Sequence, residues 1–231
     1  MNVLILGAAG GIGSSLVEKL DSLDTKLFLG YHNKKITSNH PSHQVNGSDF
    51  EATDTFVKSG LERLGSIDGV VCLAGNLILK PAHLSSEKDF SDSIGANLKT
   101  AFSVVKAVGN NLENCSVVLM STAAASIGLA NHELIASAKA GVEGLTSSAS
   151  KTYARKNLRF NTVSPGLVQT PLSEKITSNK LALSASIKMH GLQRIGKPSD
   201  ISEMIRFLID PKNDWITGQN FIVDGGLSST K

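Results

Sequence analysis

The hydrophobic positions of this chain fall into short apolar runs separated by longer segments of mixed character. Six runs are typical of strands buried on both faces: residues 3–6, 26–30, 68–75, 116–121, 158–164 and 220–226. Five segments between them are predicted to be helices: residues 12–20, 50–59, 93–111, 134–156 and 199–208. Strands that alternate with helices favour parallel βαβ units with right-handed crossovers. The predicted fold class is therefore α/β, with a doubly wound parallel sheet covered by helices on both faces.

The 231 residues are expected to form one domain, because no Gly-, Ser- or Pro-rich linker and no internal repeat divides the chain. Residues 171–197 interrupt the alternation of strands and helices, and they follow the predicted strand around Val163. Ligands of open α/β sheets bind beyond the carboxyl ends of the strands. We therefore predict that this segment is a lid over a site.

Composition excludes several classes of partner. The net charge of +3 is small and the basic residues are scattered, so no nucleic-acid-binding stripe is predicted. Cys72 and Cys115 lie in or beside apolar runs and are expected to be buried free thiols, and no Cys/His cluster suggests a metal. No apolar run approaches the ~20 residues of a membrane span. The first predicted strand starts almost at the first residue, which leaves no room for a leader and predicts a cytoplasmic protein.

The sequence GAAGGIG, residues 7–13, lies between the first predicted strand and the first predicted helix. Glycine permits a tight turn with positive φ and lets a pyrophosphate reach backbone N–H groups. A helix that starts near Gly11 points its positive end at those phosphates. In this context the turn predicts dinucleotide binding through Gly7, Gly11, Ile12 and Gly13. The alternative is a glycine turn that only packs the helix against the strand.

Further motifs resemble one enzyme family. GAAGGIG is similar to its TGxxxGxG turn, CLAG (residues 72–75) keeps Ala74 and Gly75 of its NNAG motif, and ANLKTAF holds Asn97 at its asparagine position. NTVSPGLVQTP (residues 161–171) resembles the segment that borders the nicotinamide, through Pro165, Gly166, Val168 and Thr170. GKPSDIS and WITGQNFIVDGG resemble the C-terminal helix and the last strand. The chain thus resembles, over its whole length, a short-chain dehydrogenase/reductase of the group that includes 3-oxoacyl-ACP reductases.

The resemblance implies a single-domain, three-layer αβα Rossmann fold with strand order 3-2-1-4-5-6-7. It also implies a homodimer or homotetramer, and hydride exchange between NAD(P)(H) and a carbonyl or alcohol of a small-molecule substrate. The second predicted strand ends in GYHNKK, without the acidic residue that would favour NAD. Asn33 and Lys34, with Lys35, suit a 2′-phosphate, so NADP(H) is favoured over NAD(H) unless these lysines only form a solvated turn. Asn46 falls near the expected adenine site.

The resemblance also locates a catalytic site, and this chain departs from the family there. Lys139 takes the position of the family lysine, but Ile135 occupies the position of the tyrosine that donates the proton. Thr122, or Ser121 beside it, takes the position of the serine that polarises the carbonyl. His132 lies one helical turn before Ile135 and is a candidate donor, unless it only caps the helix or faces solvent.

Two functions remain open from the sequence. The first is an NADP(H)-dependent oxidoreductase in which His132 or a water supplies the proton, and which suits a quinone or an activated ketone better than a plain ketone. The second is a catalytically silent NADP(H)-binding subunit or sensor. Six apolar residues in the predicted lid suit either a hydrophobic substrate or packing in the core or at a subunit interface: Leu172, Ile176, Leu181, Leu183, Ile187 and Met189.

Overall fold

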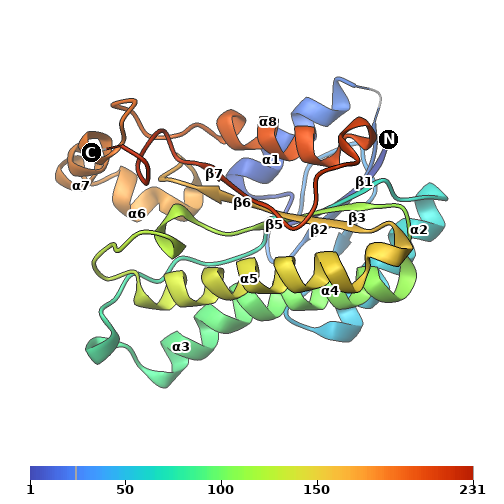
Figure 1. The fold of residues 1–231 in the computed structure, drawn as a ribbon, viewed down its shortest axis with the longest axis horizontal. Coiled ribbons are helices and arrows are strands. Elements are labelled where there is room, and N and C mark those ends of the chain that lie inside the picture. The colour runs from blue at the N-terminus through green and yellow to red at the C-terminus, as the bar shows by residue number, and fades with distance from the viewer. Residues whose placement is uncertain (24, 231) are drawn as a thin grey trace.

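A parallel sheet runs through the centre of the molecule (Figure 1). The computed structural model describes residues 1–23 and 25–230. Within them seven strands pair in parallel in the order β3-β2-β1-β4-β5-β6-β7, which confirms the order that the resemblance implied. The strands are β1 (Asn2–Leu6), β2 (Lys26–Tyr31), β3 (Ser42–Gln44), β4 (Gly69–Cys72), β5 (Ser116–Met120), β6 (Arg159–Pro165) and β7 (Asn220–Val223).

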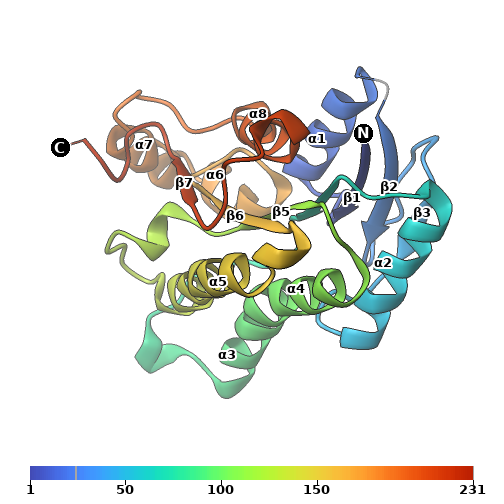
Figure 2. The same ribbon diagram turned by 45° about the vertical axis from the view of Figure 1, so that its right-hand side comes forward.

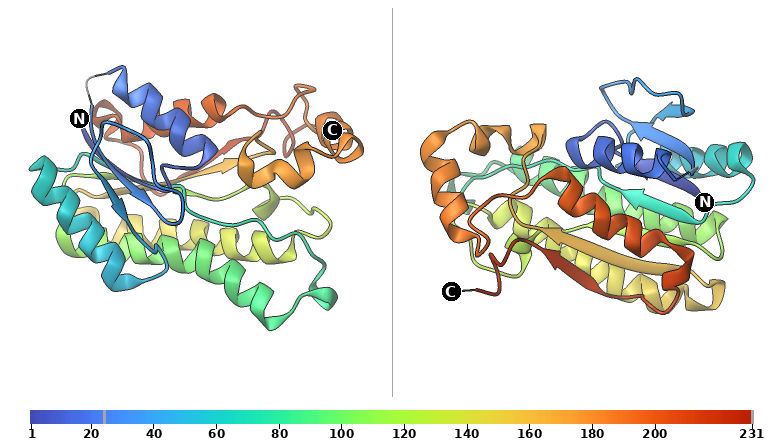
Figure 3. Two further views of the ribbon diagram at one scale, coloured as in Figure 1. Left: turned by 180° about the vertical axis from the view of Figure 1, so that it is seen from behind. Right: turned by 90° about the horizontal axis from the view of Figure 1, so that it is seen from above.

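Helices cover both faces of the sheet, which confirms the predicted α/β fold (Figures 1 and 2). The helices are α1 (Gly11–Asp21), α2 (Phe50–Leu64), α3 (Glu87–Ile94), α4 (Thr100–Asn111), α5 (Glu133–Thr152), α6 (Glu174–Thr177), α7 (Lys180–Met189) and α8 (Pro198–Ile209). Helices α1 and α8 lie on one face, and α2, α4 and α5 lie on the other, as Figure 3 also shows from behind and from above.

The strands are apolar throughout because each face of the sheet meets its own layer of helices. In β1, Leu4 and Leu6 pack against α2 and α4, whereas Val3 and Ile5 pack on the side of α1 and α8. This alternation follows the two-residue period of a strand. Cys72 and Cys115 are buried free thiols, as predicted.

The structure corrects several predicted boundaries. The strand expected to reach residue 75 ends at Cys72, and the one expected to reach residue 226 ends at Val223 before two glycines with positive φ. The helix predicted over residues 50–59 runs on to Leu64, where Gly65 (φ 82°) ends it. The helix predicted to reach residue 156 ends at Thr152, and a separate 3-10 turn follows. Each correction lies at the end of an element, where turn geometry rather than hydrophobic pattern decides.

The segment predicted as one helix over residues 93–111 has three parts. Helix α3 begins earlier, after Ser86, whose hydroxyl accepts from the Asp89 amide while the Asp89 carboxylate accepts from the Ser86 amide. A π-helical turn over Gly95–Lys99 then leads into α4. Such a turn displaces the following residues around the helix axis and often marks a functional position. Asn97 lies in this turn.

Candidate active site

A cavity of about 1620 Å³ follows the carboxyl ends of β1, β2, β4, β5 and β6. This is the edge at which open α/β sheets bind ligands. The residues that the sequence analysis assigned to a site line this cavity, with the exception of Lys35: Gly7, Gly11, Ile12, Gly13, Asn33, Lys34, Asn46, Ala74, Gly75, Asn97, Ser121, Thr122, His132, Lys139, Pro165, Gly166, Val168 and Thr170. Residues spread over most of the chain therefore meet at one place.

The glycine-rich turn lets the backbone form one wall of the cavity. Gly7 has φ +87°, and a Cβ there would lie 2.7 Å from the Ala74 amide nitrogen. A Cβ on Gly13 would lie 2.5 Å from the carbonyl oxygen of Gly7. Helix α1 begins at Gly11 and has no side-chain cap, which leaves the N–H groups of its first turn for a ligand. The turn thus has the open backbone and the positive helix end that a pyrophosphate requires.

The end of β2 forms the second part of the cavity. His32, Asn33, Lys34 and Lys35 are exposed there, and none of them is acidic. The side-chain oxygen of Asn46 accepts hydrogen bonds from the backbone and the hydroxyl of Ser48, at 3.2 and 2.9 Å. This end therefore carries positive charge and amide groups.

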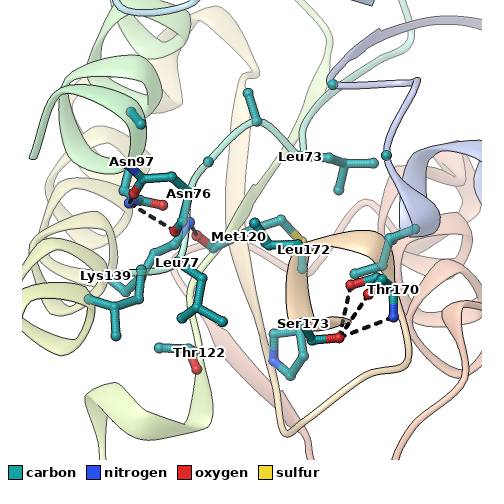
Figure 4. Close-up of a pocket in the computed structure, with 18 of the residues that line it drawn as sticks. Leu73, Asn76, Leu77, Asn97, Met120, Thr122, Lys139, Thr170, Leu172 and Ser173 are labelled. Carbon is teal, nitrogen blue, oxygen red and sulfur yellow. Dashed lines mark hydrogen bonds between the residues drawn. The ribbon is translucent and has the colours of Figure 1, made fainter. Parts of the chain in front are cut away.

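Lys139 extends from α5 into the third part of the cavity, beside β5 (Figure 4). Its Nζ donates a hydrogen bond to the carbonyl oxygen of Met120 at 2.9 Å, and the side chain is buried. Burial lowers the pKa of Lys139 to about 8, although the neighbouring Cys72 opposes the shift. The Cys72 thiol is itself neutral at pH 7 because burial raises its pKa to about 11. Loss of hydration therefore dominates, and Lys139 releases its proton more readily than a surface lysine.

Asn97 is held rigidly beside Lys139. Its Nδ2 donates to the carbonyl oxygen of Ser93 at 2.9 Å and to the side-chain oxygen of Asn76 at 2.8 Å (Figure 4). Its Oδ1 is buried without a hydrogen-bond partner in the described part of the chain. A Cβ on Gly75 would lie 2.6 Å from this oxygen and 3.5 Å from Nζ of Lys139. A buried acceptor without a donor is costly, so the amide is poised to bind a donor in the cavity.

The structure separates the roles of Ser121 and Thr122. The Ser121 hydroxyl donates to Oε1 of Glu143 at 2.6 Å, inside the protein. Thr122 borders the cavity on the same side as Lys139 (Figure 4), and its Oγ1 accepts from the Ala124 amide at 3.3 Å. An oxygen that accepts in this way keeps its own proton for donation. Both residues line the cavity, but only the Thr122 hydroxyl keeps its proton free of Glu143.

No phenol lies beside Lys139. Ile135, one turn earlier on α5, lines the cavity and is 4% exposed. Tyr31 borders the cavity at the end of β2, which is three strand spacings, or about 14 Å, from β5. Tyr153 follows α5 and packs on Phe160, about 21 Å along the helix from Lys139. Neither tyrosine replaces the missing one.

His132 is the candidate proton donor that lies three residues before Ile135 in the sequence. It occupies the residue before α5, lines the cavity and is partly exposed. Its Nδ1 lies 2.8 Å from the carbonyl oxygen of Ala130, so Nδ1 carries a proton. Nε2 remains as the ring atom that can exchange a proton with the cavity.

Comparison with known proteins decides the family. A family model described as enoyl-(acyl carrier protein) reductase matches residues 7–228. The chain belongs to the short-chain dehydrogenase/reductase family. Family membership gives this chain its general activity, NAD(P)-dependent oxidoreduction of carbonyl or alcohol groups. The resemblance proposed from the sequence is thereby confirmed.

Relatives of this short-chain dehydrogenase/reductase carry reductase and dehydrogenase names. The 3-oxoacyl-[acyl-carrier-protein] reductase FabG of Thermotoga maritima is 31% identical, over 97% of this chain and 96% of its own length. The aldohexose dehydrogenase of Thermoplasma acidophilum is 27% identical with a TM-score of 0.91, over 100% of this chain and 95% of that one. ElxO with NADP bound is 26% identical with a TM-score of 0.91, over 99% of each chain.

Several residues of the site were missed from the sequence. Asn76 positions Asn97, and Glu143 accepts from both Ser121 and Ser164. Single asparagines and glutamates carry no motif, and their contacts join distant parts of the chain. In the described residues we find neither a helix suited to crossing a membrane nor three clustered His, Cys, Asp or Glu side chains suited to a metal ion.

Proposed function

We propose that this chain is an NADP(H)-dependent oxidoreductase that reduces a carbonyl group with a proton donor other than tyrosine. The observation that carries the proposal is the arrangement of Lys139, Thr122 and Asn97 around one cavity, with Ile135 one turn from Lys139. The glycine cradle, the orphaned Oδ1 of Asn97 and the buried ammonium all fit a nicotinamide dinucleotide.

The bound cofactor would supply the hydride, and the residues of this chain would supply orientation and charge. Lys139 would hold the nicotinamide ribose, and the Thr122 hydroxyl would donate a hydrogen bond to the carbonyl oxygen that gains charge. Asn97 Oδ1 would accept a hydrogen bond from a water or ligand group in the cavity beside Lys139. The proton for the reduced oxygen would come from solvent water or from Nε2 of His132. The carbonyl oxygen of Ala130 would meanwhile hold a second proton on Nδ1 of the same ring.

A preference for NADP(H) is part of the proposal. Lys34 and Asn33 border the cavity where the adenosine ribose is expected, and no carboxylate stands there to repel a 2′-phosphate. The NADP bound in ElxO, a relative with the same fold, supports this preference.

The substrate is expected to be apolar and easily reduced. Leu172, Ile176 and Met189 of the proposed lid, residues 171–197, line the cavity, whereas Leu181 is 84% exposed. A quinone or an activated ketone needs less help from an acid than a plain ketone, because its reduced oxygen bears charge more readily. Both properties suit a site that retains a hydroxyl but lacks a phenol.

The test is NADPH oxidation by the native chain with quinones, activated ketones, plain ketones and acyl thioesters, beside a titration of NADPH binding. We expect turnover that is fastest with quinones or activated ketones, and Lys139→Ala as the inactive control. Tight NADPH binding without turnover on any substrate would instead favour the second candidate, the catalytically silent subunit. The absence of a phenol beside Lys139 supports that candidate. Absence of binding would refute both.

A further inference from the structure

We propose that His190 is a positioning residue that ties helix α7 to the loop after β6, and that only its neutral, Nδ1-protonated form makes this tie. The proposal rests on the proposed function in one respect: the loop, residues 165–168, is taken to border the nicotinamide. His190 follows α7 directly, is 3% exposed and lines the cavity. It belongs to no motif that the sequence analysis recognised.

Two hydrogen bonds fix the state of the imidazole. Nδ1 lies 2.6 Å from the carbonyl oxygen of Ser186 on α7, and the backbone amide of Leu167 donates to Nε2 at 3.3 Å. A carbonyl oxygen only accepts and a backbone amide only donates. Nδ1 must therefore carry the proton and Nε2 must be bare. The ring thus connects the last turn of α7 to the loop by one donor and one acceptor.

The loop is shaped to receive this ring. A Cβ on Gly166 would lie 2.8 Å from Nε2 of His190 and 3.1 Å from Cα of Asp224, so only glycine allows the approach. On its other side the loop is held by Gly196, whose amide donates to the carbonyl oxygen of Leu167 at 2.8 Å. Leu167 is therefore fixed between His190 and Gly196. Loss of the His190 bond frees one side of a loop that lines the cavity.

The charged groups around His190 are few. From the end of β7, Asp224 faces the ring; its carboxylate accepts from the amides of Gly226 and Ser228, at 3.0 and 2.8 Å. Burial alone would raise the pKa of Asp224, but hydrogen bonds from Ser228 and Gly226 and the nearby His190 bring that pKa below its ordinary value. Lys188, the nearest charged residue on α7, is exposed, and the loop contributes no charge.

A second proton on the His190 ring should break its hydrogen bond with the Leu167 amide. A second proton on the ring must go to Nε2, where it would point at the Leu167 amide, a donor that cannot accept it. Asp224 makes the charged ring less unfavourable, but its carboxylate is already bonded to two backbone amides and the structure shows no bond from it to Nε2. The loop is therefore expected to loosen when the ring gains its second proton.

The first part of the test uses the apo protein and needs neither cofactor nor turnover. Nitrogen-15 NMR at pH 7.5 should show His190 protonated at Nδ1 and bare at Nε2, with slow exchange of the Leu167 amide. Exchange should accelerate in acid when the same spectra show a second proton on the ring, after correction for the intrinsic pH dependence of amide exchange. A proton on Nε2 at pH 7.5, or a Leu167 amide without protection, would overturn the proposal.

The second part separates the two bonds with matched variants. His190→Gln places an acceptor near the position of Nε2, whereas His190→Asn places a donor near that of Nδ1 and leaves Leu167 without an acceptor. We expect His190→Asn to speed Leu167 exchange and weaken NADPH binding by about tenfold, the scale of one hydrogen bond. His190→Gln should keep both near native values and lose their dependence on pH between 5 and 7.5. Equal behaviour of the two variants would overturn the proposal.

These measurements separate the tie from the proposed function. If NADPH does not bind but Leu167 exchange follows the predicted pattern, the tie is supported and the proposed function fails. If NADPH binds and is oxidised while Leu167 amide exchange is the same in both variants, the positioning role of His190 is refuted and the proposed function stands. Thermal unfolding of each variant identifies any general loss of stability.

Discussion

Replacing Lys139 with methionine should stabilise the protein without cofactor and abolish turnover. Lys139 is 7% exposed, and among the described residues its ammonium donates one hydrogen bond, to the Met120 carbonyl oxygen. Its pKa is about 8 in the fold, against an ordinary 10.5. The charged ammonium is therefore less stable in the folded protein than in the unfolded chain. At 1.36 kcal/mol per pKa unit, the charged ammonium destabilises the fold by about 3 kcal/mol at pH 7.

Methionine has a similar length and no charge, but it gives up the bond to Met120, which is worth about 1 kcal/mol. The net stabilisation at pH 7 is therefore about 2 kcal/mol, or roughly 4–8 °C in Tm for a chain of this size. Between pH 8 and 10.5 the unfolded chain binds the extra proton, so the stability of the native protein rises with pH. The advantage of Lys139→Met is thus complete below pH 8 and close to zero at about pH 10.

The assay is urea unfolding of the native protein and of Lys139→Met at pH 7 and at pH 10. Taking the difference between the two proteins removes the titration of all other groups. A variant that is less stable than the native protein at pH 7, or an advantage that does not change with pH, would refute the buried-charge argument. Loss of activity together with increased stability is the expected trade-off at a functional site.

Three other changes test individual residues. Thr122→Val should lower kcat by about 100-fold or more, the scale of one hydrogen-bond donor at a developing charge. Ser121→Ala should mainly lower thermal stability, because it deprives Glu143 of a donor. Equal losses of kcat in the two variants would contradict this division. Lys34→Asp should raise the Kd for NADPH by about tenfold or more and that for NADH much less, and equal changes in the two titrations would remove Lys34 from the ribose site. His132→Ala should lower kcat by less than about threefold if solvent supplies the proton, whereas a fall of about 100-fold would assign the proton to His132.

The sequence predicted most of the fold because buried parallel strands are continuous apolar runs. Strand β3 was implied by the family's strand order, but the hydrophobic pattern did not locate it: Ser42, His43 and Gln44 form an edge strand with no apolar run, and only pairing with β2 makes them a strand. The start of α3 was also missed, although Ser86 and Asp89 have the spacing of a capping box. Both elements are polar and partly exposed, so hydrophobic pattern does not reveal them.

The site was predictable where it lies in turns that follow strands, because the fold brings those turns to one edge. The sequence could not show which of Ser121 and Thr122 keeps its hydroxyl proton available, since both follow β5 and the Ser121 hydroxyl donates to Glu143 in α5. The importance of His190 depends on contacts with Ser186 and Leu167, and on a glycine at position 166. Such three-way contacts arise only when the chain is folded.

The central claim is that the site is complete except for its acid, and Ile135→Tyr tests it most directly. Its matched control is Ile135→Phe, which adds the ring without the hydroxyl. We predict that Ile135→Tyr raises kcat for NADPH-dependent reduction of plain ketones by about 100-fold or more, the scale of general acid catalysis, and that Ile135→Phe does not. The gain should be smaller for quinones. A tyrosine variant that is no faster than the phenylalanine variant on any ketone would contradict the account.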